Sequence, residues 1–368
     1  MSPDTDDRST ARPPVLSNAL RNCVVFLAVV AGGVVVMYLR GIIAPLVVAA
    51  FLLMLIDGLD RTLAQRLPAV PAWLRSTLGA MLILGGFAGV VIICAHDALS
   101  FGAQIAVIGP KIDALLARVA GQFQAPAPQV HDLLHVLTSA ASLTHVFGAA
   151  RGFLSEAALA MIYLGFLLVS RQAFGHKLRR MFAKPEGRAH AERVFARVRG
   201  ASEAYVGLQT LKAALVASVA YAIMWVLGMS NPLFLALILF LAAYVPIVGG
   251  FVGALLPTLV ALGEFDTPFK PLLLLGLLAG ILFVIENIIL PKLQADQLNI
   301  DPVFVLLSLG FWGALLGVVG ALLSTPLTVV VMAIAAEFDG ARWLAVLISK
   351  DGDIAEREAQ IATRDSPG

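Results

Sequence analysis

Long apolar segments separated by short polar stretches recur along most of the chain. Six of them have lengths close to that needed to cross a membrane as a helix: residues 24–39, 42–56, 77–95, 153–169, 206–228 and 271–289. Two further apolar segments, beginning at Pro232 and at Pro302, are longer. The first of these, residues 232–262, would be about 46 Å long as one straight helix, whereas the hydrocarbon core is about 30 Å thick.

The middle of segment 232–262 explains its length. Pro246 and the pair Gly249-Gly250 interrupt an otherwise uniform apolar run. Proline removes a backbone donor and glycine weakens helical order, so both favour a break in the helix. We therefore predict two half-helices joined by an irregular turn at residues 246–250.

The same design recurs about 70 residues later in the chain. The paired positions are Asn231-Pro232 and Asp301-Pro302, Phe234 and Phe304, Gly250 and Gly320, and Pro257 and Pro326. Each long segment also follows an ordinary apolar helix. The pattern predicts an internal repeat, residues 205–262 and 271–338, in which each copy is one helix plus one broken helix. Such repeats are typical of secondary transporters.

The two broken segments can be placed in a membrane in two ways. As re-entrant hairpins they would make the repeat inverted, and as full spans they would make it parallel. Each half of about 13 residues reaches only about 20 Å, so we predict re-entry. The alternative is a pair of tilted helices with proline kinks.

Composition supports the membrane assignment, since 59% of the 368 residues are hydrophobic and 14% are charged. Soluble domains carry about 25% charged residues, and the mean hydropathy here is +0.89. The net charge of +2 gives no reason to expect a nucleic-acid partner. The sequence therefore predicts an all-α, multi-pass protein whose environment is the lipid bilayer.

Basic residues set the predicted orientation, because they favour the cytoplasmic side. Between residues 171 and 203 there are nine Lys or Arg and three Glu. Placing this segment in the cytoplasm puts the amphipathic helices expected in residues 97–150 outside, and puts the 57–75 loop and both termini inside. The predicted regions are a tail at 1–22, a scaffold at 23–204 with a basic segment at 171–204, a transport unit at 205–338 and a second tail at 339–368.

Polar side chains within apolar segments are the candidates for function, because they are costly to bury in a membrane. Gln209, Thr210 and Lys212 lie near the start of the helix predicted at 206–228. Lys212 has an alternative role, which is to extend its ammonium group to the interface. Thr325 and Thr328 flank Pro326 and are expected to return hydrogen bonds to a broken helix.

Glu286-Asn287 is the second polar group, late in the helix predicted at 271–289. A buried carboxylate needs a partner or a proton, which would suit a role in coupling. The alternative is an interfacial position, because Pro291-Lys292 follows closely. The expected substrate pathway comprises Gln209, Pro246, Gly249, Gly250, Glu286, Asn287, Gly317, Gly320 and Pro326.

Enzyme and cofactor signals are weak in this sequence. His131 and His135 are four residues apart, but no acidic or cysteine partner stands at a metal-site spacing. Neither His-Glu-x-x-His, Gly-x-Ser-x-Gly nor a phosphate-binding loop with Gly-Lys-Ser/Thr is present. We therefore predict no enzyme, no metal and no cofactor.

The chain resembles the autoinducer-2 exporter family of bacterial permeases. The resemblance rests on Gln209, on Val245-Pro246-Ile247-Val248-Gly249, on Glu286-Asn287 followed by Pro291-Lys292, and on Pro302 through Gly317-x-x-Gly320 to Pro326. The order of the spans also fits. Three positions depart from the family pattern: Ala243 replaces an asparagine, Gly250 a proline and Ala295 a glycine. The missing asparagine removes a polar group from the expected site.

The resemblance implies a transporter in the bacterial inner membrane. Family members export a small quorum-sensing furanone derivative, and others are proposed to exchange sodium or lithium for protons. The resemblance also implies a homo-oligomer, a pentamer, in which the repeat region shifts in an elevator-type movement. Our leading hypothesis is export of a small polar molecule by alternating access. The alternatives are a sodium or lithium/proton antiporter and a scaffold that recruits a partner through the basic segment 171–204.

Overall fold

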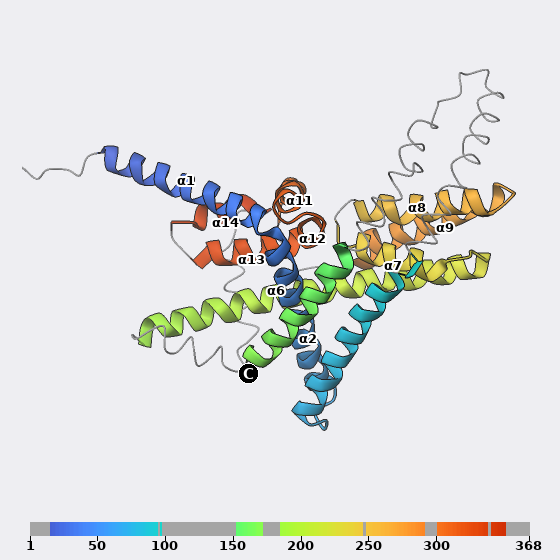
Figure 1. Ribbon diagram of the computed structural model, residues 1–368, viewed down its shortest axis with the longest axis horizontal. Helices are drawn as coiled ribbons and strands as arrows, with labels where there is room; N and C mark the ends of the chain where they lie inside the picture. The colour runs from blue at the N-terminus through green and yellow to red at the C-terminus, as the bar shows by residue number, and fades with distance from the viewer. Residues whose placement is uncertain are drawn as a thin grey trace, which may run out of the picture.

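Helices make up the secondary structure in the part of the chain that the structure describes. The computed structural model describes residues 15–94, 96–97, 152–171, 185–245, 248–290, 300–337 and 340–350. Its labelled elements are α1 (Val15–Tyr38), α2 (Arg40–Arg66), α6 (Pro185–Leu227), α7 (Pro232–Ala242), α8 (Val248–Glu264), α9 (Phe269–Val284), the π-helix η1 (Ile285–Ile289), α11 (Pro302–Leu316), α12 (Val318–Leu322), α13 (Ser324–Glu337) and α14 (Arg342–Ile348). Two more helices, Ala72–Cys94 and Gly152–Arg171, precede α6. The predicted all-α class is confirmed (Figure 1).

Five helices among the described residues are long and apolar enough to cross a membrane. They are Arg40–Arg66, Ala72–Cys94, Gly152–Arg171, Gly187–Leu227 and Phe269–Ile289. These helices overlap five of the six predicted spans, and the sixth, residues 24–39, lies almost entirely in α1. The helices of the two broken segments are apolar but shorter. The chain is thus a multi-pass membrane protein.

The helices α2, Ala72–Cys94 and Gly152–Arg171 pack against one another through an apolar core. Leu52 and Ile56 of α2 and Leu164 of the third helix are buried there. We call these three the scaffold helices. Their packing follows from apolar stripes on each helix, which bury most area when they face one another.

A network of ion pairs joins the scaffold helices to α6 at one end. The carboxylate of Asp57 in α2 accepts hydrogen bonds from Arg171, at 3.0 Å, and from Arg199 of α6. Glu203 of α6 pairs with Arg199 at 2.6 Å and with Arg61 at 2.8 Å. The segments 57–75 and 171–204, both predicted to be cytoplasmic, therefore start at the same end of the molecule.

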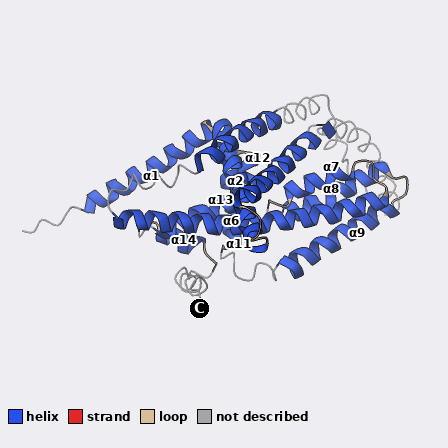
Figure 2. Cartoon of the chain, turned by 90° about the horizontal axis from the view of Figure 1, so that it is seen from below, coloured by secondary structure: helices blue, strands red, loops and turns tan. Residues whose placement is uncertain are grey.

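The long helix α6 connects all parts of the fold. It is a single helix of 43 residues, about 65 Å long, and in Figure 2 it runs across the middle of the molecule, with α9 and α14 drawn lower. The predicted start of this helix at residue 206 is wrong, because the helix begins at Pro185. The Arg199–Glu203 pair, at i and i+4, supports helical structure across the expected boundary at residues 204–205.

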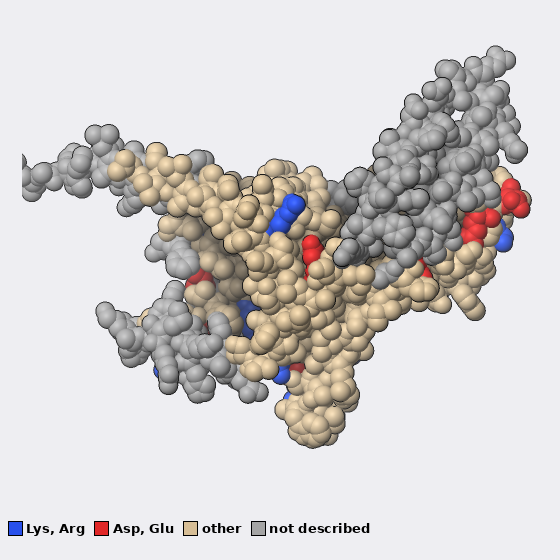
Figure 3. Space-filling model, viewed as in Figure 1, with Lys and Arg blue, Asp and Glu red and all other residues tan. Residues whose placement is uncertain are grey.

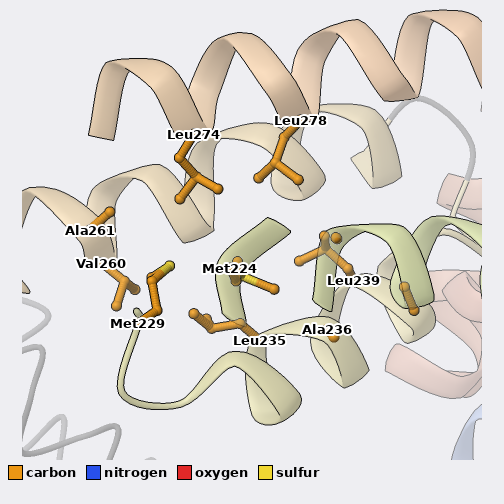
Figure 4. Close-up of a cluster of buried hydrophobic side chains, with 11 residues drawn as sticks. Met224, Met229, Leu235, Ala236, Leu239, Val260, Ala261, Leu274 and Leu278 are labelled. Atoms are coloured by element: carbon orange, nitrogen blue, oxygen red, sulfur yellow. The ribbon is translucent and has the colours of Figure 1, made fainter. Parts of the chain in front are cut away.

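The helices α7 and α8 form an antiparallel pair, which we call the first hairpin. At its base, the backbone N–H of Ser230 donates to Oε1 of Glu264 at 2.6 Å, and the Ser230 hydroxyl bonds the same oxygen. Figure 4 shows Leu235 and Leu239 of α7 pointing into the same buried cluster as Val260 of α8. The two ends of the first broken segment thus lie side by side, as expected for a hairpin.

The core around the first hairpin extends to its neighbours. Met224 of α6 and Leu274 and Leu278 of α9 complete the cluster (Figure 4). On the surface, charge is sparse on the face in Figure 3, and acidic side chains gather where the first hairpin leads into α9. Charged residues at helix ends and apolar residues between them fit a membrane protein.

The helices α11, α12 and α13 form the second hairpin. The indole Nε1 of Trp312 donates to the Thr328 hydroxyl at 3.0 Å, which joins α11 to α13. At the base, Asp301 caps α11 by accepting from the backbone of Val303 at 2.7 Å. Its own N–H donates to the carbonyl of Ile348 in α14. The second broken segment therefore also folds back on itself.

The two hairpins reach the region of Ala213 from opposite directions along α6. The base of the first packs near Met229, just beyond the C-terminus of α6. The base of the second, around Ile300, packs on Tyr205 and Val206. Leu322 of the second hairpin and Tyr244 of the first both contact the cluster around Ala213, so the tips meet there. In Figure 1 the hairpins accordingly lie on different sides of α2.

Several predictions fall on residues outside the described ranges. They are the amphipathic helices expected at 97–150, apart from Asp97, most of the tails at 1–22 and 339–368, residues 172–184 of the basic segment, and Pro246. The motif Pro291-Lys292 and Ala295 also lie outside.

Candidate functional site

Gln209 forms a hydrogen bond with the backbone where the first hairpin is interrupted. Its side chain is 7% exposed, and Nε2 donates to the carbonyl oxygen of Ala243 at 2.7 Å. Ala243 follows the last residue of α7, where carbonyl groups lose their partners within the helix. Gln209 therefore supplies the hydrogen bond that the broken helix lacks.

Tyr244 adds a second link between the interruption and α6. Its hydroxyl lies 2.6 Å from the hydroxyl of Thr210, which itself donates to the carbonyl of Val206 at 2.8 Å. Since a threonine hydroxyl has one hydrogen, Tyr244 is the donor in this pair. Its ring packs edge-on against Phe51 and Phe240. The sequence analysis missed Tyr244. Its signal in the sequence is a polar hydroxyl within an apolar segment, two residues before Pro246.

The two glycines of the first interruption lie in a helix, not in a turn as predicted. Helix α8 begins at Val248, so Gly249 and Gly250 belong to its first turn. A Cβ at Gly249 would lie 2.7 Å from the carbonyl oxygen of Ala242 and 3.0 Å from Cα of Ala243. Glycine is therefore required here for close backbone approach rather than for turn geometry. The break itself spans the residues between Ala242 and Val248.

Glu286 lies beside the start of α8. A Cβ at Gly250 would be 3.8 Å from Oε2 of Glu286, and the Glu286 carboxylate interacts electrostatically with Lys212 of α6. Glu286 is exposed and sits in η1. A π-turn inside a helix is common at functional sites, and nothing in our sequence analysis anticipated it. Glu286, Lys212 and Gly250 thus converge from three elements.

Asn287 does not join this group. Its side chain is exposed, and Nδ2 donates to the carbonyl of Phe283 in the preceding turn at 3.0 Å. This bond stays within one helix. Within the described residues, Glu286 is the member of the pair that reaches another element.

The second hairpin is interrupted twice. Gly317 separates α11 from α12 with φ +69° and ψ −146°, a conformation that favours glycine. Gly320 has no room for a side chain, because a Cβ would overlap the carbonyl oxygen of Trp312. Leu323 then separates α12 from α13. The second broken segment is therefore interrupted at Gly317 and again at Leu323, with the short helix α12 between the two breaks.

Pro326 plays a different part from the one predicted. It lies in the first turn of α13, where its missing N–H has little effect. The hydroxyl of Thr328 donates to the carbonyl of Ser324 at 2.8 Å, four residues earlier in the same helix, so it does not pair a carbonyl that the break leaves free. The break comes earlier, at Leu323.

The site residues therefore form two connected groups on α6. Gln209 and Thr210 bind the interruption of the first hairpin, and Leu322 of the second packs beside it. Lys212 and Glu286 lie by Gly250 at the start of α8. A carboxylate, an amine and an amide close to two broken helices can bind a small polar molecule or a cation.

Comparison with known proteins identifies the family of the chain. The family model described as AI-2E family transporter matches residues 24–339. The AI-2 transport protein TqsA of Escherichia coli K12 is 26% identical over 350 residues, covering 92% of this chain and 98% of that protein. Proteins of Borreliella burgdorferi and Haemophilus influenzae, each named "Putative transport protein", are 29% identical over 210 residues and 26% over 298. The alignments cover 55% of both chains in the first case, and 78% of this chain and 84% of the relative in the second. With a match across nearly its whole length, the chain belongs to the AI-2E family of membrane transporters.

Proposed function

We propose that the protein is a secondary transporter that moves a small polar molecule across the bacterial inner membrane by alternating access. One observation carries the proposal: two interrupted hairpins run along α6 from opposite directions, and their tips meet near Ala213. Transporters place their sites where discontinuous helices meet. Both hairpins would re-enter the membrane, and the two repeats, 205–262 and 271–338, would be inverted.

The boundary between the fixed scaffold and the moving transport unit would lie within α6. The scaffold at 23–204 contains the scaffold helices, and the transport unit at 205–338 contains both hairpins. The ion pairs of Asp57 and Glu203 support the scaffold end of α6 as its fixed point. Their arginines support a cytoplasmic location for that end, with both termini on the same side. We also propose a homo-oligomer, a pentamer, with an elevator-type shift of the transport unit.

The proposed substrate is a small polar compound such as a quorum-sensing signal. Its support is the polar group formed by Gln209, Lys212 and Glu286, together with the relative named AI-2 transport protein. The second candidate, a sodium or lithium/proton antiporter, is favoured by the Glu286 carboxylate, since a carboxylate binds either a metal cation or a proton. A non-transporting scaffold would have no need for two glycines packed without room for a side chain.

Transport by the purified protein in sealed liposomes tests these functions. Autoinducer-2 trapped inside should leave faster than from liposomes without protein, and unlabelled autoinducer-2 outside should exchange with labelled compound inside. Proton movement driven by a sodium or lithium gradient, without movement of the signal, would favour the antiporter. Absence of both activities in protein that retains its fold would favour the scaffold.

A further inference from the structure

We propose that a cavity between the scaffold helices and the two hairpin tips is a lipid site that takes one acyl chain. The cavity has a volume of about 280 Å³ and is partly open. The scaffold helices form one wall, and Tyr244 of the first hairpin with Leu322 and Leu323 of the second form the other. Thr210, whose hydroxyl bonds that of Tyr244, also lines the cavity. Lys212 and Glu286 are not among the lining residues.

The lining of the cavity favours an apolar occupant. Aliphatic and aromatic side chains dominate, among them Phe51, Leu55, Phe87, Val90, Phe153 and Leu323. The hydroxyls of Thr210 and Tyr244 are bonded to each other and to the carbonyl of Val206. Glu156, the acidic residue in the lining, is exposed. A cavity of this kind does not bind water well, because a buried water needs two to four polar partners.

The surroundings favour a lipid chain as the occupant. Each scaffold helix is long and apolar enough to cross a membrane, and most lining residues lie within these apolar helices, so the cavity lies at the depth of the bilayer's hydrocarbon. An empty space would leave its walls without dispersion contacts, and a flexible acyl chain can fill an irregular shape.

An acyl chain here would contact both hairpin tips at once. Under the proposed function these tips shift against the scaffold helices. A close-packed interface resists such movement, whereas a flexible chain can change shape with it. The effect on movement of the hairpin tips rests on the proposed function. Binding of the acyl chain does not depend on that function, and the experiment measures binding alone.

Two adjacent glycines offer a matched pair of variants. Gly86 lines the cavity and Gly85 does not, and a Cβ added to either meets no atom within 4 Å. Gly86→Trp should fill the cavity, while Gly85→Trp adds the same side chain to the same helix elsewhere. Should Gly86→Trp fail to fold, Gly86→Leu is the smaller substitute.

The probe is a vesicle of phosphatidylethanolamine and phosphatidylglycerol in which some acyl chains carry a photoreactive diazirine. After irradiation, peptide mass spectrometry locates the labelled residues. Leu52 and Ala157 line the cavity and are each 6% exposed, whereas Phe166, at 71%, serves as the reference for contact with bulk lipid. We expect labels at all three in the wild-type protein. Gly86→Trp should lose the labels at Leu52 and Ala157 and keep that at Phe166, and Gly85→Trp should keep all three.

Three results would overturn the proposal. The first is labelling of Phe166 without Leu52 or Ala157 in the wild-type protein. The second is unchanged labelling of Leu52 and Ala157 when Gly86→Trp or Gly86→Leu is folded. The third is crosslinking of these residues to another copy of the chain instead of to lipid. Since none of these measurements involves transport, their outcome is independent of the transport assay.

Discussion

Gln209 of α6 donates a hydrogen bond of 2.7 Å to the carbonyl oxygen of Ala243, where the first hairpin is interrupted. The two residues are 34 positions apart in the chain. The bond joins the helix that reaches the scaffold to the tip of a hairpin. It therefore stabilises a backbone conformation that the apolar surroundings would otherwise disfavour.

Replacing Gln209 by methionine should preserve the volume and leave the Ala243 carbonyl unpaired. We expect a loss of about 1–3 kcal/mol in the stability of the folded protein and loss of transport. Thermal unfolding in detergent and liposome flux are the measurements. Thr258→Val is the matched control, because this 6% exposed hydroxyl donates only within its own helix, to Ala254. Equal effects of both variants would show that the link to Ala243 has no special role.

The bond between Ser230 and Glu264 predicts the membrane topology of the first hairpin. Single cysteines replacing Asn231 and Glu264 should react with an impermeant thiol reagent from the same, outer side. Gln65→Cys, at the exposed end of α2, provides the cytoplasmic reference. All three single-cysteine variants are made in a background from which Cys23 and Cys94 have been removed. Labelling of the Glu264→Cys thiol solely from the cytoplasmic side would rule out re-entry.

Gly249→Val should abolish transport, because its Cβ would lie 2.7 Å from the carbonyl oxygen of Ala242. The clash involves backbone on both sides, so it can be relieved only by moving α7 against α8. We expect the variant to insert and assemble, and flux in liposomes to fall to background. Gly280→Val is the control, since a Cβ there meets no atom within 4 Å. Normal flux through Gly249→Val would mean that the interruption is merely a kink.

Glu286→Gln should remove the pH dependence of transport. Glutamine keeps the size and hydrogen bonding of the side chain but has no titratable proton, so the charge that acts on Lys212 is lost at every pH. We expect the variant to assemble and to bind substrate within roughly an order of magnitude of the wild type. Flux measured across a pH series is the test.

Two other outcomes for Glu286→Gln have distinct meanings. Loss of assembly would make Glu286 a structural partner within the bundle. An unchanged flux profile at every pH would indicate an interfacial residue, as its exposure allows. Asn287→Leu removes the neighbouring amide, which bonds its own helix, without adding or removing a titratable group, and should keep the pH dependence of flux.

Asp57→Asn should destabilise the junction between α2 and α6. The change removes the charge that Arg171 and Arg199 share, at a site where the Asp57 side chain is 14% exposed. Hydrogen bonds to charged groups contribute about 1.5–3 kcal/mol, so thermal unfolding in detergent should shift clearly downward. Arg188→Ala breaks the exposed pair with Glu192 and should change stability by less than about 0.5 kcal/mol. Equal shifts for the two variants would contradict a special role for Asp57.

The sequence by itself determined the class of the protein and the positions of most helices. Whether a segment enters a membrane depends on the summed hydrophobicity of its own residues, which needs no knowledge of contacts. The same local reasoning located the interruption near Pro246 and the importance of the glycines Gly249 and Gly250. It placed these features within a few residues. It was wrong in assigning Gly249 to an irregular turn, because Gly249 lies in the first helical turn of α8.

Only the tertiary structure decided how these segments meet. A segment that folds back on itself and a straight helix can have the same composition, and the contact of Ser230 with Glu264 shows that the first broken segment folds back. The partner of Gln209, the separation of Glu286 from Asn287 and the pairing of Asp57 with Arg199 likewise join residues that no periodicity relates. Helix propensity did not place the start of α6 either, because ion pairs continue that helix through the basic segment. Contacts between distant residues depend on packing in three dimensions, and a single sequence does not record them.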